Sequence, residues 1–386
     1  MTNLQKSIQR EIALFSEAIL SEGGSVPEVS KAAFCKARKK LRPTAFVELS
    51  NTVIQKFNES GQGLQWHGYR LLGVDGSNVE LPNSKEIQEN FGVFQTRTDG
   101  KAICLARTLM LYDCLNHMTL HGSLDTMEAS ENSMLWEALP DMDISENDIL
   151  IFDRYYASYL LLFYLSERKI PFCFRMKKGT WKIVDAFHKS GEQSSCVTIS
   201  LPVKDQESAA GLGITAGSIT VRLAQVELEG GETELLLTSL TDEVLFSIAD
   251  LKELYNHRWP IEEHYKAFKH KVCIENFSGK SYKAILQDFY AKIFIMNLTA
   301  VAVRPINEAL KKETVKLKYT HKVNFTEAIA TMKKAVVSFF VTMKITEALT
   351  RLKRRLFSFT EPIRPERKAN RKHLIKRKQY MTYKQV

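Results

Sequence analysis

Two aspartates in the chain each follow directly on a short run of apolar residues. Residues 71–74 lead into Asp75, and residues 149–152 lead into Asp153. Such runs are typical of buried strands, and ligands of open sheets bind beyond the ends of strands. Carboxylates suit hard cations such as Mg²⁺ or Mn²⁺, and two of these ions about 3.5–4 Å apart can activate displacement at a phosphate. Metal-dependent phosphoryl transfer is therefore one chemistry that these residues could perform.

The pattern alone leaves other roles open for both aspartates. Residues 109–112 lead into Asp113 in the same manner, so the arrangement is not specific. Aspartate is also common in turns and at the first position before a helix. A turn or cap role for Asp75 and Asp153 therefore remains an alternative.

The segment 255–269 supplies a third acidic candidate. At 100° per residue, four of its side chains would lie within an arc of about 60° on a helix: Tyr255, Arg258, Glu262 and Lys269. A surface helix with salt-bridged pairs would show the same face. Because proline breaks a helix interior but suits its first turn, Pro260 predicts a break near Trp259 and a second helix with Glu262 near its start.

The elements that must position these residues follow from the periodicity of the chain. Strands are expected at 69–74, 79–81, 101–112, 118–122, 148–152 and 172–176, with the turn-prone residues 75–78 between the first two and helices at 127–139 and 156–166. Strands that come first and then alternate with helices predict a mixed sheet with helices packed on it. The fold class is therefore α/β, mixed.

The chain divides into five expected regions. They are a helical, basic region at 1–62, the first part of a catalytic domain at 63–178, a β-rich insertion at 179–245, the second part of the catalytic domain at 246–300, and a helical region with a basic tail at 301–386. No internal repeat of solenoid length is visible.

Charge and composition restrict the partners. The 386 residues carry 54 Lys and Arg against 44 Asp and Glu, and residues 351–386 alone hold 13 basic and two acidic residues. Residues 31–42 are also basic, which fits either a solvated helix face or a helix along a phosphate backbone. The six cysteines are scattered, and the apolar stretches 157–165 and 293–303 are shorter than the ~20 residues that span a bilayer. We expect reduced thiols, a cytoplasmic location and no membrane segment.

The spacing Y-(2)-R-(3)-E-(6)-K resembles the signature of insertion-sequence transposases of the IS-four family, within the DDE class. Tyr255, Arg258, Glu262 and Lys269 match it at all four places. The aspartates in Asp75-Gly-Ser and Asp153-Arg-Tyr-Tyr resemble the first two catalytic residues of the family. Tyr155 stands where the family usually has Gly, which puts the local turn in doubt. The resemblance covers roughly residues 30–300, including a β-rich insertion before the glutamate.

This resemblance implies a fold, a reaction and partners. The fold would be RNase H-like, with Asp75, Asp153 and Glu262 as catalytic residues and ligands of two Mg²⁺ (or Mn²⁺) ions. The reaction would be cut-and-paste transposition, in which the ends of a DNA element are cut and joined to target DNA. The partners would be terminal inverted repeats, target DNA and a second copy of the chain, near the nucleoid in a bacterial cytoplasm.

Further side chains are candidates for contact with DNA. They are Tyr255, Arg258, Lys266, Lys269, Arg154, Arg38, Lys39 and Lys40. Arg154 could instead orient Asp153. We expect Trp259 in the core, with stacking on a base as the alternative, and structural roles for His117 and His121. Two other functions share these features: a DNA-binding regulator that no longer cuts, and a nuclease without strand transfer.

Overall fold

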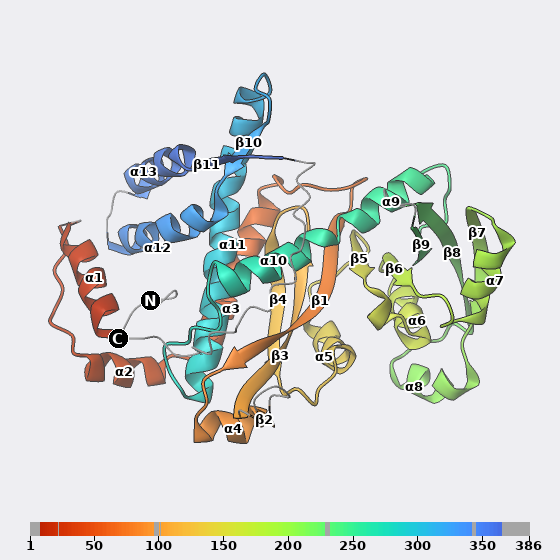
Figure 1. Cartoon of the computed structure of the whole chain (residues 1–386), viewed down its shortest axis with the longest axis horizontal. Coiled ribbons are helices and arrows are strands. Elements are labelled where there is room, and N and C mark those ends of the chain that lie inside the picture. The colour runs from red at the N-terminus through yellow and green to blue at the C-terminus, as the bar shows by residue number, and fades with distance from the viewer. Residues whose placement is uncertain are drawn as a thin grey trace.

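A mixed sheet of nine strands forms the centre of the protein, as a computed structural model shows (Figure 1). The structure describes residues 8–21, 23–95, 100, 102–227, 232–341 and 345–364. The strand order is β2-β3-β1-β5-β6-β9-β8-β7, and β4 also pairs with β3. The strands are β1 (Arg70–Leu81), β2 (Phe94–Gln95), β3 (Ala102–Asp113), β4 (Met118–Asp125), β5 (Asp148–Phe152), β6 (Phe172–Met176), β7 (Ser194–Ser200), β8 (Ser218–Glu227) and β9 (Thr233–Thr238). The predicted mixed α/β class is confirmed.

β1 is one continuous strand, so the turn predicted at residues 75–78 is wrong. The antiparallel ladder with β3 runs without a shift from Leu72 opposite Asp113 to Leu81 opposite Cys104. Each paired residue can place its backbone groups in that ladder, which outweighs the local preference of Asp-Gly-Ser-Asn for a turn. Asp75 therefore lies within a strand and not at its end.

Helices cover both faces of the sheet. On one face lie α9 (Ile248–Asn256), α10 (Trp259–His270) and α11 (Tyr282–Glu313), and Ile261, Phe268 and Phe289 from these helices join one core cluster. On the other face lie α5 (Glu131–Ala138), α6 (Tyr159–Glu167), α7 (Lys182–Ser190) and α8 (Gln206–Gly211), with Leu135 and Phe163 in a second cluster. The sheet is thus buried on both sides at its centre.

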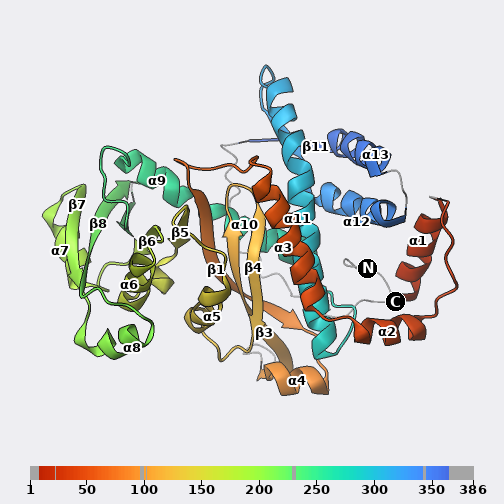
Figure 2. The same ribbon diagram turned by 180° about the vertical axis from the view of Figure 1, so that it is seen from behind.

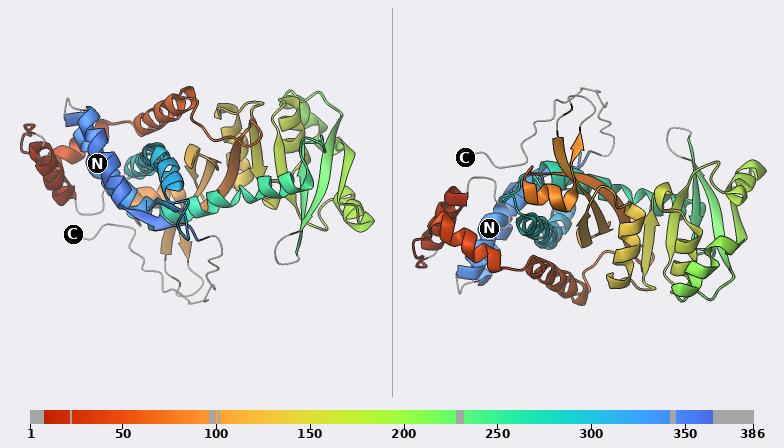
Figure 3. Two further views of the ribbon diagram at one scale, coloured as in Figure 1. Left: turned by 90° about the horizontal axis from the view of Figure 1, so that it is seen from above. Right: turned by 90° about the horizontal axis from the view of Figure 1, so that it is seen from below.

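The β-rich segment 179–245 extends the central sheet. β9 pairs antiparallel with β6, and β8 and β7 follow outward from it. Viewed from above, this part lies at the opposite end of the molecule from α1 (Ile8–Ser21) and α2 (Lys31–Lys40) (Figure 3). The β-rich character expected for this segment is observed.

Two helical layers complete the fold. α3 (Thr44–Glu59) packs along β4 and α11 (Figure 2), while α12 (Phe325–Val341) and α13 (Ile345–Ser358) pack on α11. A short ribbon joins β10 (His321–Val323) to β11 (Thr360–Pro362). Short helices α4 (Lys85–Phe91), η1 (Leu139–Asp141), η2 (Arg154–Tyr156) and η3 (Val203–Asp205) fill the connections. The basic tail from residue 365 lies outside the described residues.

α11 is the one helix of the described chain that is long and apolar enough to span a bilayer. Within the protein, however, 67% of its most apolar window is buried. Its contacts with α3, α12 and β4 account for that apolar surface, so its composition is explained by a core position.

Candidate active site

Asp75 and Asp153 follow the last residue pair of two neighbouring parallel strands. Val74 of β1 lies opposite Phe152, the last residue of β5; Asp75 continues β1, and Asp153 is the first residue beyond β5. Adjacent strands are about 4.8 Å apart, and residues in register point to the same face. Residues 78 positions apart in the sequence are thereby brought side by side.

Asp153 also caps the turn that follows β5. Its side chain accepts a hydrogen bond from the backbone N–H of Arg154 at 2.7 Å, at the start of η2. The cap role that its position suggested is therefore present. It leaves the other carboxylate oxygen of Asp153 available for a ligand, because a carboxylate accepts at two oxygens.

Glu262 lies in the first turn of α10, and the predicted helix break precedes it. α9 ends at Asn256 and α10 begins at Trp259, with Pro260 in its first turn. Arg258 Nη2 donates to Glu262 Oε1 at 2.6 Å. Its Nε also donates to the hydroxyl of Tyr255 at 3.2 Å. The predicted grouping of these three signature residues is observed, and Arg258 at its centre is only 6% exposed.

Two side chains of α10 attach this helix to the strand of Asp75. The Tyr265 hydroxyl donates to the backbone carbonyl of Asp75 at 2.8 Å. Lys269 Nζ donates to Ser77 Oγ at 2.7 Å. These bonds fix the position of the Glu262 helix relative to β1, although the two elements are far apart in the sequence.

Burial makes the Asp75 carboxyl group a weaker acid than an exposed one. Loss of hydration raises its pKa to about 7, the positive charge of Arg258 acts in the opposite direction, and the carboxylates of Glu131 and Glu262 add to the rise. A buried carboxylate beside other acidic groups favours either a proton or a metal cation. A divalent ion would replace that proton.

Glu131, on α5, is an acidic neighbour of Asp75 that the sequence analysis missed. A Cβ built on Gly76 would lie only 2.1 Å from Glu131 Cδ, so the carboxyl group rests against the backbone of β1. Glu131 Oε2 also accepts a hydrogen bond from the Tyr156 hydroxyl at 2.9 Å. The only signal in the sequence is an acidic residue after Ser130 at a helix start, which is common in helices without any other role.

The acidic side chains fit a hard cation by type, but they are not assembled as a three-ligand site. Within the described residues, no three Asp, Glu, His or Cys side chains are grouped so that they could hold a metal ion. Arg258 holds Glu262 Oε1, and the convergence of Asp75, Asp153 and Glu262 on metal ions stays a prediction. Mg²⁺ commonly uses one or two carboxylates together with waters and substrate phosphates, so the pair Asp75 and Asp153 suits it.

The structure separates the basic candidates into exposed and buried groups. Four of these candidates are exposed: Lys39, Lys40, Arg154 and Lys266. The predicted DNA contact of Arg38 is wrong. Its guanidinium bonds to Gln287 at 2.6 Å and Asp288 at 2.9 Å, and its side chain is 14% exposed. It therefore joins α2 to α11 and is not presented to a ligand.

The structure also places three further residues of the sequence analysis. Trp259 is 51% exposed, so its predicted core position is wrong; as the first residue of α10 it projects outward, with Lys266 Nζ 5.7 Å from its ring centre. His117 is exposed, and its Nδ1 lies 3.2 Å from the Tyr112 hydroxyl. His121 is half-buried, and burial lowers its pKa. The contact with Tyr112 fits a structural role for His117, and the role of His121 stays a prediction.

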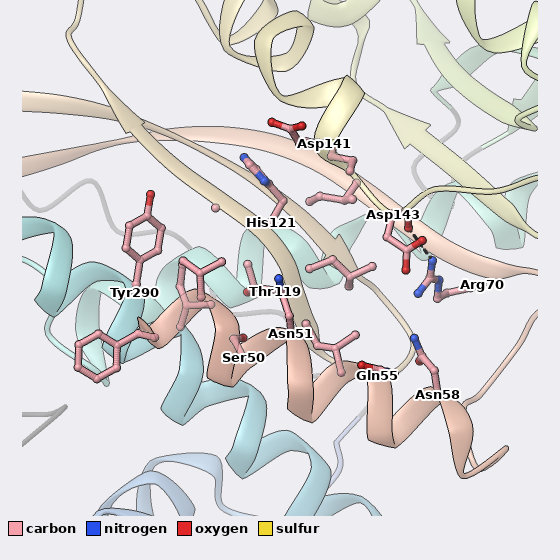
Figure 4. A pocket seen from close by; sticks show the side chains of 18 of the residues that line it. Ser50, Asn51, Gln55, Asn58, Arg70, Thr119, His121, Asp141, Asp143 and Tyr290 are labelled. Atoms are coloured by element: carbon pink, nitrogen blue, oxygen red, sulfur yellow. Dashed lines mark hydrogen bonds between the residues drawn. The ribbon is translucent and has the colours of Figure 1, made fainter. Parts of the chain in front are cut away.

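A large cavity lies apart from the carboxylates. It measures about 670 Å³ and is lined by α3 on one side and by β4 with residues 141–143 on the other (Figure 4). None of Asp75, Asp153 and Glu262 lines it. This cavity is therefore separate from the acidic site.

The family model for the transposase DDE domain matches residues 66–298. The chain belongs to this family of DDE transposases. Asp75, Asp153 and Glu262 of this DDE transposase all lie within the matched residues, as does Glu131.

Two Escherichia coli (strain K12) proteins are similar to this DDE transposase. The transposase InsG for insertion sequence element IS4 is 24% identical over 295 residues, which are 75% of this chain and 64% of InsG. The putative transposase InsZ is 28% identical over 104 residues, or 27% of this chain and 34% of InsZ. The chain thus spans less than two thirds of the length of either relative.

A solved structure also resembles this DDE transposase, at a low level. The piggyBac transposase synaptic complex with hairpin DNA matches with a TM-score of 0.43 and 10% sequence identity, over 90% of this chain and 74% of that chain. This similarity is too low to say anything about the site.

Proposed function

We propose that the chain is a DNA transposase that cuts phosphodiester bonds at the ends of a mobile element and joins the freed 3′ ends to target DNA. The main support is the position of the two aspartates directly after the pair Val74 and Phe152 of β1 and β5, with Glu262 on a helix that is bonded to β1. This arrangement belongs to a chain of the DDE transposase family.

The strand order supports assignment of the catalytic domain to the RNase H-like fold. β1, β3 and β4 form antiparallel neighbours, α5 follows, and β5 then pairs parallel with β1 on its other side. Asp75 lies on β1 and Asp153 directly follows β5, the two adjacent parallel strands of this order. The boundaries proposed for the catalytic parts are 63–178 and 246–300, with 179–245 as the insertion.

Divalent ions, Mg²⁺ or Mn²⁺, would activate the attacking oxygen and stabilise the leaving one. Asp75 and Asp153 would bind both ions, and Glu262 would complete the set once it releases Arg258. The freed guanidinium could then bind a DNA phosphate through two parallel hydrogen bonds. Arg258 would thus pair with Glu262 in the absence of DNA and with a phosphate in its presence.

Exposed basic side chains would bind the DNA backbone around this site. Lys266 lies on the helix of Glu262, Arg154 follows Asp153 in the chain, and Lys39 and Lys40 project from α2. Lys269, also on α10, is half-buried and would have to release Ser77 to reach DNA. Such contacts give affinity that depends on salt and carry little sequence information. The exposed Trp259 could contact DNA near the cut by stacking, whereas Tyr255 is buried and would reach DNA only after it leaves Arg258. We propose terminal inverted repeats and target DNA as substrates, two copies of the chain per synaptic complex, and action at the nucleoid in the cytoplasm.

The decisive experiment mixes the purified protein with DNA that flanks its gene and with Mg²⁺. Asp75→Asn, Asp153→Asn and Glu262→Gln should each reduce end cleavage by about 100-fold or more while DNA binding persists, because each removes a negatively charged oxygen from the site. Glu263→Gln changes the neighbouring exposed glutamate and serves as the control. EDTA should abolish cleavage. Full activity in all three site variants would overturn the proposal.

A DNA-binding regulator that does not cut is the second candidate. The ion pair of Glu262 with Arg258 favours it, because a neutralised Glu262 is not available as a ligand. If the protein retards the element-end DNA in a gel but makes no nicks in it at any Mg²⁺ or Mn²⁺ concentration, this alternative is established. Nicks without joined products would instead indicate a nuclease without strand transfer.

A further inference from the structure

A groove lies close to the segment that follows Asp153. It measures about 700 Å³ and is lined by residues 157–160 around the start of α6, residues 180–183 around the start of α7, and residues 198–200, 204 and 205 of the insertion. Ala157 follows Asp153 by four residues, a stretch that spans at most about 14 Å or roughly four base pairs of DNA. The groove therefore begins near the proposed site.

Two stacked aromatic rings join the helices that line this groove. The rings of Tyr159 in α6 and of Trp181, directly before α7, lie 4.0 Å apart at an angle of 6°. Trp181 is only 7% exposed, and Ile199 of β7, which also lines the groove, is 4% exposed. Because Trp181 and Ile199 belong to the second core cluster, the groove keeps its shape without a ligand.

Positive charge gathers around the groove. Lys182 and Lys204 line it, and Lys177 and Lys178 lie in the segment that leads from β6 to α7. All four lysines are exposed, and within the described part of the chain no ion pair holds any of them. Asp205 is the acidic residue of the lining. Like charges held around a concave surface repel one another and attract an anion, so the groove favours an anionic ligand.

The other polar groups of the groove can donate hydrogen bonds to phosphates. Exposed hydroxyl groups come from Thr180, Thr198 and Ser200. The side chain of Trp181 caps none of the backbone N–H groups in the first turn of α7, which adds donors at the same place. Lysine, hydroxyl and backbone N–H donors hold the phosphates of DNA and do not read its bases. The groove thus suits a DNA backbone of any sequence.

A solvated face or a peptide partner explains less of this arrangement. Lysines on a solvated helix face need no groove, and they commonly pair with acidic residues one turn away. β7 is the last strand of the sheet, so a peptide strand could add to its free edge. Such a partner would use the backbone of β7, whereas Lys182 lies on α7 and Lys204 on η3. The charges therefore favour a polyanion over a peptide.

The place of the groove in the molecule indicates which DNA it meets. The insertion lies at the opposite end of the molecule from α2, which carries the exposed Lys39 and Lys40 (Figure 3). DNA that crosses the site and contacts α2 on one side of the cut would therefore approach the insertion on the other side. DNA outside a mobile element differs at each insertion site, so only contacts that are independent of sequence can hold it.

We propose that this groove binds the phosphate backbone of the DNA that flanks the element, with Lys182 and Lys204 as its main contacts. The inference rests on the proposed function, because it assumes that the chain cuts at the ends of an element. Asp205 weakens the attraction, which allows the flanking DNA to leave once it is cut.

The affinities for two duplexes that share one element end test this inference. One duplex stops at the cleavage position, and the other continues through about two helical turns of flanking DNA, or roughly 20 base pairs. EDTA prevents cleavage of either duplex. Lys182→Gln and Lys204→Gln should each weaken binding of the longer duplex by roughly 3-fold to 10-fold and lower the magnitude of its salt slope by about 1. Binding of the shorter duplex should not change.

Two other variants and a footprint make the test specific to the groove. Lys189→Gln changes an exposed lysine in the last turn of α7, outside the groove, and should bind both duplexes as the native chain does. Asp205→Asn removes the negative charge and should bind the longer duplex more tightly. Hydroxyl-radical footprinting should show protection of the flank next to the cut by the native chain and loss of it in the double variant Lys182→Gln with Lys204→Gln. Thermal unfolding checks that each variant retains the fold.

The possible results separate this inference from the proposed function. Equal weakening of both duplexes by the lysine variants would assign the groove to element DNA, and weaker capture of target DNA alone would assign it to the target. No effect on any DNA would show that the groove binds none. Each of these results overturns the inference and leaves the proposed function intact if the native chain cuts end DNA in Mg²⁺. A native chain that neither binds nor cuts end DNA overturns both.

Discussion

Asp75 is the residue whose environment has the clearest consequence for behaviour in solution. Burial raises its pKa to about 7, against about 3.9 in an unfolded chain. Between these values the folded state binds more protons than the unfolded state. The contribution of this group to stability is therefore fully present below about pH 4 and is lost as the pH rises through 7.

Asp75→Asn should accordingly stabilise the metal-free protein at high pH. Asparagine does not ionise, so we expect the variant to gain about 2–4 kcal/mol relative to the native chain at pH 8 and almost none of this at pH 4. Urea unfolding in EDTA at a series of pH values measures the difference. Asp141→Asn, at an exposed position, is the control. A difference that does not change with pH would contradict the raised pKa.

Arg258 connects two other residues of the four-residue signature. Its guanidinium bonds to Tyr255 and Glu262 in this structure, and both partners belong to the same signature. The spacing in the sequence predicts a shared face but does not say which pairs form. The observed ion pair holds the Glu262 carboxylate against Arg258, and its role as a ligand stays a prediction.

At the scale of elements, the attachment of α2 to α11 depends on Arg38. Its guanidinium donates to Gln287, Ser278, Asp288 and the carbonyl of Ala284. The side chain of Asp288 is only 8% exposed, so loss of the arginine would leave a buried charge without its cation. Breaking such a pair is strongly destabilising.

Arg38→Met should therefore lower the free energy of unfolding by about 3 kcal/mol. Lys39→Met, at the next and exposed position, should change it by less than about 0.5 kcal/mol. Lys39→Met should instead reduce the magnitude of the salt slope of DNA binding by about 1 if Lys39 contacts a phosphate. Urea unfolding and DNA titrations at several salt concentrations measure both. Equal stability of the two variants would show that Arg38 does not hold α2.

The continuity of β1 is the second result at this scale. Local sequence favours a turn at residues 75–78, whereas β3 pairs with every residue from Leu72 to Leu81. The strands β5 and β6, by contrast, coincide with their predicted bounds of 148–152 and 172–176. A short, uniformly apolar run has few alternatives to a buried strand, but a polar stretch within a long strand takes its conformation from its partner.

At the scale of the whole molecule, positive charge is concentrated at the C-terminal end of the sequence, well after the last strand of the central sheet. Residues 365–386 carry eight Lys and Arg and one Glu. The preceding segment is part of the fold, because β11 pairs with β10 and Phe359 accepts a hydrogen bond from Asn324. A chain that ends at Arg364 therefore keeps these contacts and removes most of the basic tail.

Removal of residues 365–386 should lower the magnitude of the salt slope of DNA binding by several units, since each phosphate contact adds about 0.9 to the slope. Metal-dependent cleavage by the bound protein should persist at low salt, because the carboxylates are untouched. Replacement of the eight basic residues by glutamine, at unchanged chain length, is the control and should give the same slope. An unaltered slope in both variants would show that the tail does not contact DNA.

By itself, the sequence determined the class of fold, the two aspartates and the four-residue signature, because apolar runs and fixed spacings are local features. The tertiary structure decided that Asp75 lies within β1, next to the end of β5 that Asp153 follows, that Arg258 holds Glu262, and that Arg38 is bound inside the protein. It also brought Glu131 to Gly76. These outcomes depend on which distant segments pair, and the free energy of that pairing comes from burial and ladder hydrogen bonds that no short stretch of sequence contains.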